Sequence, residues 1–259
     1  MCFDHDSRPP GLPAEVPIAG AAAAERLELT SADGTRVSAA LAQAPEAAPT
    51  GVVILPDVRG LYRFYVELAE RFAEAGHSAI AMDYFGRTAG TGERGEDFDF
   101  WPHVAETRLP QVQADAAAGL AVLRERTGVR AAVTVGFCFG GSQSLMVATR
   151  PDLGFSGVIA FYGGLADRGE VMPSPIDRAG DMHGPILGLY GEADDHIPMA
   201  QVSELDQRLT AAGVEHEIYS YAGAPHSFFD RRFDEYADAC EDAWRRMLGF
   251  LSDAGAPAS

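Results

Sequence analysis

A single cysteine within a glycine-rich hexapeptide is the residue of this chain best suited to covalent chemistry. Residues 136–141 read GFCFGG; the apolar run 131–135 before them predicts a buried strand, and residues 142–148 after them predict a helix. A strand, then G-x-C-x-G-G, then a helix is typical of a nucleophile elbow with cysteine in place of serine. The flanking glycines leave room for the sharp turn. Cys138 is thereby expected at a helix N-terminus, where free N–H groups favour a thiolate and a developing oxyanion.

Two other interpretations of this hexapeptide are open. Free cysteines are often buried and inert, so Cys138 could be a structural residue in a tight turn. The glycines also suggest a dinucleotide-binding loop, but that fingerprint requires G-x-G-x-x-G, and position 138 is cysteine. A base and an orienting acid later in the chain favour the nucleophile, because a reactive cysteine needs both.

One histidine and two aspartates occupy the places where such a nucleophile needs its partners. In folds with this elbow the order along the chain is nucleophile, acid, histidine. Asp194 and Asp195 follow the strand predicted over 185–190, and His226 follows the last predicted strand. Either aspartate could instead cap the next helix, so the residues alone do not choose between them. Further histidines on predicted loops stay open as candidates: His103, His183 and His196.

Strands and helices alternate along most of the chain. Strands are predicted over residues 51–55, 78–82, 131–135, 157–162, 185–190 and 215–221, and helices over 62–75, 109–126, 142–148, 199–212 and 234–251. The alternating runs 27–30 and 37–42 predict a hairpin, and residues 86–107 predict a long loop with room for short helices. The pattern predicts an α/β fold with a mostly parallel central sheet and helices on both faces. We expect an N-terminal arm over 1–24 and a single domain over 25–255.

Bulk composition argues against several classes of protein. The 259 residues are 47% hydrophobic, enough for a sizeable core, and the net charge of −18 disfavours nucleic acid and anionic membranes as partners. No apolar run approaches the roughly 20 residues that span a bilayer, and residues 1–6 lack the pattern of a secretory signal. Three sparse cysteines suit a reducing compartment, so we predict a cytoplasmic location. We expect a monomer or a homodimer. Cys2, Asp4 and His5 lack a metal-ligand spacing, and a solvated terminus is expected there.

Five segments of the sequence resemble the dienelactone hydrolase family, which has the α/β-hydrolase fold. They are residues 55–61 (LPDVRGL), 82–87 (MDYFGR), the elbow 136–141 and the turns that hold Asp194 and His226. At the level of motifs the resemblance spans roughly residues 27–250.

The resemblance implies a Cys-His-Asp triad. Cys138 would be the nucleophile, His226 the base and acid, and Asp194 the residue that orients the histidine. An oxyanion hole would come from the backbone N–H groups of Val58 and Phe139. The implied activity is hydrolysis of small carboxylic esters or lactones through an acyl-thioester, with no cofactor and no metal.

Two positions depart from the family. Members that act on dienelactone carry a glutamate beside the nucleophile, which holds the resting thiol, and this chain has Asp57 there, one methylene shorter. The resemblance implies that Asp57 takes this part and modulates the nucleophile. Those members also bind the substrate carboxylate with an arginine four residues after the histidine, where this chain has Asp230. An aspartate would repel a carboxylate, so dienelactone itself is not the expected substrate. Four arginines are candidates to compensate: Arg59, Arg63, Arg87 and Arg231.

Aromatic and charged residues near these motifs are the candidates for substrate binding. We predict that Tyr84 and Trp101 line the site together with Arg59 and Arg87. The segment 163–184 either walls the pocket or is a surface connection. Two other classes of function stay open: a thiol-dependent acyltransferase or redox protein, and a ligand-binding homologue without catalysis.

Overall fold

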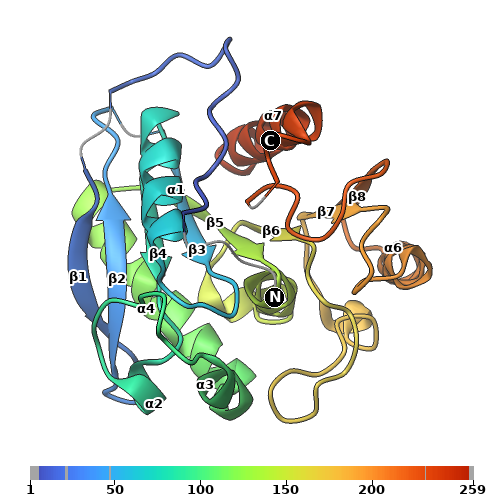
Figure 1. Cartoon of the computed structure of the whole chain (residues 1–259), viewed down its shortest axis with the longest axis horizontal. Coiled ribbons are helices and arrows are strands. Elements are labelled where there is room, and N and C mark those ends of the chain that lie inside the picture. The colour runs from blue at the N-terminus through green and yellow to red at the C-terminus, as the bar shows by residue number, and fades with distance from the viewer. Residues whose placement is uncertain (1–5, 21–22, 47, 231, 257–259) are drawn as a thin grey trace.

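The computed structural model describes residues 6–20, 23–46, 48–230 and 232–256. These residues form an eight-stranded sheet in the order β1-β2-β4-β3-β5-β6-β7-β8 (Figure 1). The strands are β1 (Glu25–Thr30), β2 (Arg36–Ala42), β3 (Thr50–Leu55), β4 (Ala79–Met82), β5 (Ala131–Phe137), β6 (Gly157–Phe161), β7 (Ile186–Gly191) and β8 (His216–Tyr221). β2 pairs antiparallel with β1 and with β4, and the pairs from β4 to β8 are parallel. The predicted mostly parallel sheet with an antiparallel hairpin at its edge is therefore confirmed.

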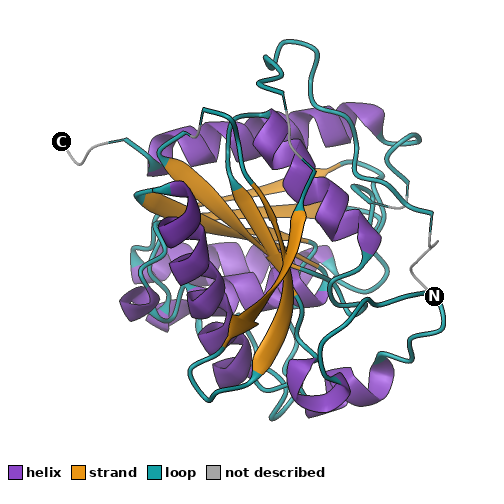
Figure 2. Ribbon diagram, turned by 90° about the vertical axis from the view of Figure 1, so that its left-hand side faces the viewer, coloured by secondary structure: helices purple, strands orange, loops and turns teal. Residues whose placement is uncertain are grey.

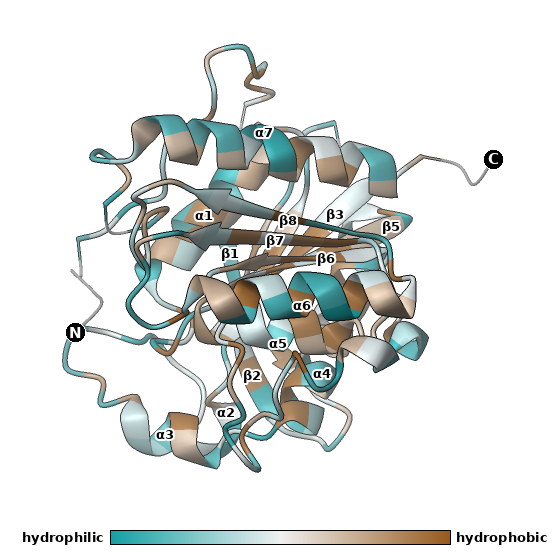
Figure 3. Ribbon diagram, turned by 90° about the vertical axis from the view of Figure 1, so that its right-hand side faces the viewer, coloured by the Kyte–Doolittle hydropathy of each residue, from teal (hydrophilic) through white to brown (hydrophobic). Residues whose placement is uncertain are grey.

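Helices cover both faces of the sheet (Figure 2). On one face lie α1 (Arg63–Glu74) and α7 (Ala237–Ala254), and on the other lie α4 (Leu109–Thr127), α5 (Phe139–Val147) and α6 (Met199–Ala212), as Figure 3 shows. The segment 86–107 contains the short helices α2 (Gly86–Ala89) and α3 (Trp101–Glu106). Two 3-10 turns complete the described elements, η1 (Pro151–Leu153) and η2 (Ala179–Asp181). None of the described helices is both long and apolar enough to cross a membrane.

Burial on both faces explains why the central strands are continuous apolar runs. Every residue of β3 and β6 is buried, because helices exclude water from both sides of the sheet. α1 instead buries one side, with Phe64, Leu68 and Phe72 at successive turns. Each such side chain contributes about 1.5–3 kcal/mol when fully buried.

The last helix begins later than the sequence predicts. α7 starts at Ala237 rather than at residue 234. Tyr236 has φ −122° and ψ 38°, outside the helical region, and its N–H donates to the carbonyl of Arg232 at 3.1 Å. The dihedral angles of Tyr236 therefore separate this turn from the helix that begins at Ala237.

The described part of the N-terminal arm lies across α1 and α7, before β1 begins. The indole N–H of Trp244 donates to the carbonyl of Pro10 at 3.3 Å. The N–H of Ala19 donates to the carbonyl of Glu74 at 2.9 Å. These bonds tie the arm to the face of the sheet that α1 and α7 cover.

Parallel pairing brings several loops to the same end of the sheet. Leu55, the last residue of β3, pairs with Gly136 of β5, so the loop 56–62 lies beside the turn at Cys138. β7 and β8 end level, with Gly191 opposite Tyr221, and their following loops are therefore neighbours. The carboxyl ends of parallel strands are where such folds bind ligands.

Candidate active site

Cys138 lies in a strained turn between β5 and α5, as the strand, turn and helix in the sequence predict. Its φ of 53° and ψ of −109° are rare for a residue with a side chain, and strain of this kind is common at functional sites. The turn is held by hydrogen bonds from Cys138 N–H to the Phe161 carbonyl (3.0 Å) and from Ser142 N–H to the Cys138 carbonyl (3.1 Å). A Cβ at Gly136 would stand 1.9 Å from the Gly140 carbonyl oxygen, which explains the need for glycine.

His226 and Asp194 form a short hydrogen bond next to this turn. The ring Nδ1 of His226 donates to Oδ2 of Asp194 at 2.6 Å, and both side chains are largely buried. The other carboxylate oxygen of Asp194 accepts the N–H groups of His196 (2.8 Å) and Ile197 (3.2 Å). Asp195 is exposed. Of the two aspartates that the sequence left open, the structure brings Asp194 to His226.

The surroundings of His226 favour a protonated ring. Burial of the imidazole opposes protonation, but hydrogen bonds to Asp194 and Cys138, and the charges of the same two groups, raise the pKa of His226 to about 10. Asp194 takes Nδ1 of the ring, which leaves Nε2 as the nitrogen available on the side of Cys138. An imidazole oriented by an acid next to a cysteine is suited to moving a proton between the sulfur and a bound substrate.

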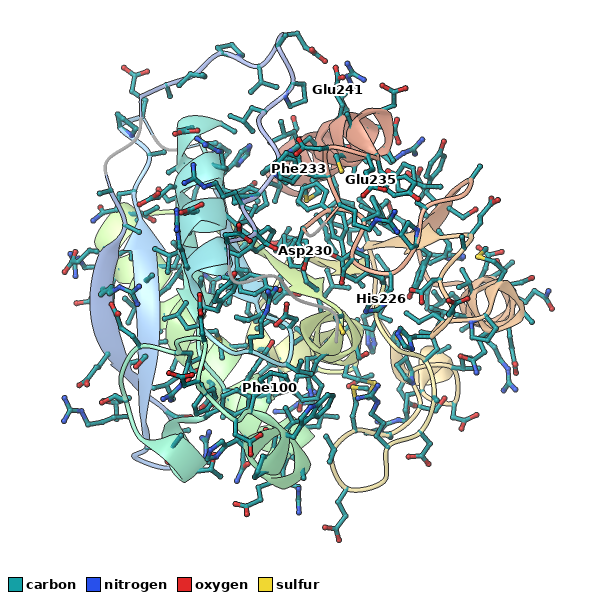
Figure 4. The ribbon with its side chains drawn as sticks, viewed as in Figure 1. Phe100, His226, Asp230, Phe233, Glu235 and Glu241 are labelled. Atoms are coloured by element: carbon teal, nitrogen blue, oxygen red, sulfur yellow. The ribbon has the colours of Figure 1, made fainter. Side chains whose placement is uncertain are left out.

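These side chains border a cavity of about 530 Å³. Its apolar lining includes Val58, Phe100, Trp101, Phe139 and Ile197. Its polar lining consists of Arg59, Glu96, Cys138, Ser142, Arg168, His196 and His226. Gly164 also lines the cavity. Figure 4 labels Phe100 and His226 at this end of the sheet. A hollow that combines apolar walls with convergent polar groups is typical of a site for a small organic substrate.

Two backbone N–H groups beside Cys138 have no hydrogen-bond acceptor among the described residues: those of Val58 and Phe139. Both residues line the cavity. Phe139 is also the first residue of α5, where the N–H groups of a helix lack intrahelical partners. The pair is thus available to a negatively charged oxygen in the cavity.

Asp57 is occupied by residues other than the thiol. Its carboxylate accepts hydrogen bonds from the Arg59 guanidinium at 3.0 Å and from the Tyr65 hydroxyl at 2.7 Å. Within the described part of the chain, no hydrogen bond joins Asp57 to Cys138. Asp230 lies against the same guanidinium, at 3.4 Å from its Nη2. The sequence suggested separate parts for these two aspartates, and the structure places both on Arg59.

Other predicted residues lie outside the cavity lining. The Tyr84 hydroxyl donates to the Pro56 carbonyl at 2.8 Å, and its ring packs edge-on against Phe139. Tyr84 therefore contacts residues of the site without lining the cavity. Arg87 pairs with Asp115 (2.7 Å) and Asp33 (2.8 Å) near the hairpin, and it is not among the residues that line the cavity. This position does not support the prediction that Arg87 binds substrate, because two carboxylates hold its guanidinium and it does not line the cavity.

The remaining candidates are placed as follows. Arg63 pairs with Glu67 on α1, and Arg231 lies outside the described residues, as do Cys2, Asp4 and His5. His196 stands beside His226, with ring centroids 5.3 Å apart, whereas His103 stacks on Phe98. Among the described residues no three His, Cys, Asp or Glu side chains are placed to hold a metal ion.

Sequence reasoning missed several cavity residues, among them Ser142 and Arg168. Ser142 stands one helical turn after Cys138, and the i, i+4 spacing could have predicted that both face the same side. Arg168 belongs to the segment 163–184, and no local pattern distinguishes it from a solvated arginine. Tyr65, whose hydroxyl contacts Asp57, reads in the sequence as one more buried aromatic residue of α1.

The fold and this arrangement define a class of protein. A mostly parallel sheet, an elbow after its central strand, and an acid and a histidine after later strands are the features of the α/β-hydrolases. The model of the dienelactone hydrolase family matches residues 37–255, and the chain belongs to this family.

Relatives and solved structures agree with this assignment. The chain is 34% identical over 215 residues to a protein of Escherichia coli (strain K12) named "Putative carboxymethylenebutenolidase", covering 79% of this chain and 77% of that protein. A protein of the same name from Saccharolobus solfataricus is 28% identical over 254 residues, covering 85% of this chain and 95% of that one. A crystal structure titled as a putative dienelactone hydrolase from Klebsiella pneumoniae superposes with a TM-score of 0.77 at 27% identity, over 88% of this chain and 98% of that one.

Proposed function

We propose that this protein hydrolyses carboxylic esters or lactones through a thioester on Cys138, with His226 and Asp194 completing the triad. The observation that carries the proposal is that His226, held by Asp194, lines the same cavity as a cysteine in a strained elbow. The names of the relatives support the same class of bond. A member of a hydrolase family with such a site is best explained as a cysteine-dependent hydrolase.

In the first half-reaction the Cys138 thiolate attacks the carbonyl carbon. The carbonyl π electrons move to oxygen, and the N–H groups of Val58 and Phe139 stabilise the resulting oxyanion. When the intermediate collapses, the C–O bond to the alkoxy group breaks. The protonated His226 gives its proton to that oxygen, and an acyl-thioester remains on Cys138. A lactone would open in this step and keep its alcohol on the bound acyl chain.

In the second half-reaction water takes the place of the alcohol. The neutral His226 removes a proton from the water as the oxygen attacks the thioester carbonyl. The same N–H groups stabilise the second oxyanion, and its collapse breaks the C–S bond. Cys138 leaves as the thiolate beside a protonated His226, so the nucleophile and its acid are restored and a carboxylic acid is released. Asp194 stays ionised and holds the ring in place.

The charges beside the nucleophile favour substrates that carry no carboxylate close to the reacting carbonyl. Arg59 is buried against two carboxylates, those of Asp57 and Asp230, which offset its attraction for a substrate carboxylate. The apolar part of the cavity lining suits a hydrophobic acyl or alcohol group.

The test is hydrolysis of p-nitrophenyl acetate by the wild type and by Cys138→Ala, with folding matched by circular dichroism. We expect release of p-nitrophenol to fall by about 10⁴-fold or more in Cys138→Ala. Brief mixing of the wild type with the ester followed by acid quench should yield an acetyl group on Cys138 by peptide mass spectrometry. Full activity in Cys138→Ala would exclude Cys138 as the nucleophile.

A further inference from the structure

We propose that Asp57, Arg59 and Asp230 form a buried ionic clamp that positions the Val58 N–H for the oxyanion, and that Asp57 is not a partner of the resting thiol. The proposal rests on the proposed function, since it assigns the three residues a part in the same reaction. In this proposal all three are positioning residues, because the effect assigned to them acts through the backbone of Val58.

The clamp fixes the loop on both sides of Val58. Oδ1 of Asp57 accepts the backbone N–H of Arg59 at 2.8 Å and its Nε at 3.0 Å, which folds the Arg59 side chain back over the loop. On the other side, the Tyr65 hydroxyl accepts the Asp57 N–H at 3.1 Å and donates to the Asp57 carboxylate at 2.7 Å. Asp57, Arg59 and Tyr65 are each at most 4% exposed, so water does not compete for these bonds.

This loop leaves one N–H group for the substrate. Of the six residues from 57 to 62, five donate their backbone N–H to an acceptor within the described chain, and Val58 is the exception. A peptide group held between two immobilised neighbours has little freedom to turn. An oxyanion donor needs that rigidity, because a donor that must reorganise during the reaction loses most of its value.

Asp230 ties the loop to the segment that carries His226. Its carboxylate lies 3.4 Å from Nη2 of Arg59, across 171 residues of sequence. The N–H of Asp230 donates to the Ser227 carbonyl at 3.3 Å, within the turn that follows His226. Figure 4 labels both Asp230 and His226. The same guanidinium thus connects the loop of the oxyanion donor to the loop of the base.

Burial makes this arrangement costly to disturb. Asp230 and Asp57 are each 1% exposed. Removing one partner of a buried ion group leaves an uncompensated charge, and the remaining groups shift to find new partners. The loop 56–62 would then move, and displacing a catalytic group by about 1 Å costs on the order of 100-fold in rate.

The experiment separates the oxyanion role from a role on the thiol. Asp57→Asn, Asp230→Asn and the wild type are compared in two reactions of Cys138: acylation by p-nitrophenyl acetate, and alkylation by iodoacetamide followed site by site with mass spectrometry. Acylation develops an oxyanion, whereas alkylation displaces iodide and develops none. We expect acylation to slow by about 10–100-fold in both variants with KM changed less than about twofold, and alkylation to change less than about twofold.

A matched control measures the effect of breaking a buried ion pair elsewhere. Asp115→Asn removes the buried partner of Arg87. Neither residue lines the cavity, so this variant should leave both reactions at the wild-type rate. If Asp57→Asn or Asp230→Asn does not fold, the conservative variants Arg59→Lys and Asp230→Glu replace them, and a drop in acylation without a drop in alkylation again supports the clamp. Equal changes in the two reactions, or wild-type acylation in folded clamp variants, would overturn it. Loss of the proposed function is a separate result, because it would be seen as activity in Cys138→Ala.

Discussion

Two buried carboxylates at the same end of the sheet are paired with cations of different kinds. Asp194 holds the imidazole of His226, and Asp57 holds the guanidinium of Arg59. An imidazole can give up and regain a proton during a reaction, while a guanidinium stays charged in proteins. An acid beside a titratable ring can therefore support proton transfer, and an acid beside a permanent charge can only hold structure. The comparison teaches that the partner, rather than the carboxylate, determines what a buried acid does.

The largest effect that separates the two acids is expected for Asp194→Asn. Loss of the carboxylate leaves His226 without the group that orients it and stabilises its charge. We expect kcat on p-nitrophenyl acetate to fall by about 10⁴-fold, far more than in Asp57→Asn. Asp195→Asn is the matched control, because Asp195 is adjacent in sequence but exposed, and its activity should equal that of the wild type. If Asp57→Asn proves as damaging as Asp194→Asn, the distinction between the two acids fails.

A smaller effect concerns stability against pH. The pKa of His226 is raised to about 10 in the folded protein, although burial by itself would lower it, because Asp194 and Cys138 favour the charged ring. The folded state therefore holds this proton more tightly than the unfolded state, whose histidine titrates near about 6.5. The resulting stabilisation is complete below about pH 6.5 and is lost as the pH rises through about 10.

Urea unfolding at pH 6, 8 and 10 measures this effect. The free energy of unfolding of the wild type, relative to His226→Gln, should decrease steadily from about pH 6.5 to about pH 10, by a few kcal/mol in all. Asp230→Asn should follow the wild-type slope over the same range, since Arg59 does not titrate there. A flat difference between wild type and His226→Gln would show that His226 is not charged in the folded protein.

The smallest effect is expected at the rim of the cavity, where water competes with every contact. Trp101 is 60% exposed and lines the cavity. Trp101→Ala should raise KM for esters of aromatic acids by about fivefold, corresponding to partial burial of the indole on binding, and should leave kcat nearly unchanged. Ile18→Ala is the matched control, since Ile18 is 69% exposed and lies on the arm. An equal response of the two variants would remove Trp101 from substrate binding.

Much of the fold followed from local patterns. Apolar runs bounded by glycine predicted the parallel strands, and the helix over Met199–Ala212 has the boundaries that its spacing predicts. These predictions were correct because strand and helix periodicity depend on neighbours within a few residues. The segment 86–107 was harder, because its helices α2 and α3 are too short for a periodic pattern.

The site was determined by sequence only in part. The hexapeptide 136–141 fixed the place of the turn at Cys138, since a Cβ at Gly136 would meet backbone atoms. The order of Cys138, Asp194 and His226 along the chain also followed from the sequence. Only the tertiary structure decided that Asp194 rather than Asp195 meets His226, that Arg87 is held by Asp115, and that Asp57 and Asp230 share Arg59. The physical reason is distance along the chain: steric limits on a turn act between adjacent residues, whereas ion pairing across as many as 171 residues depends on how the loops pack.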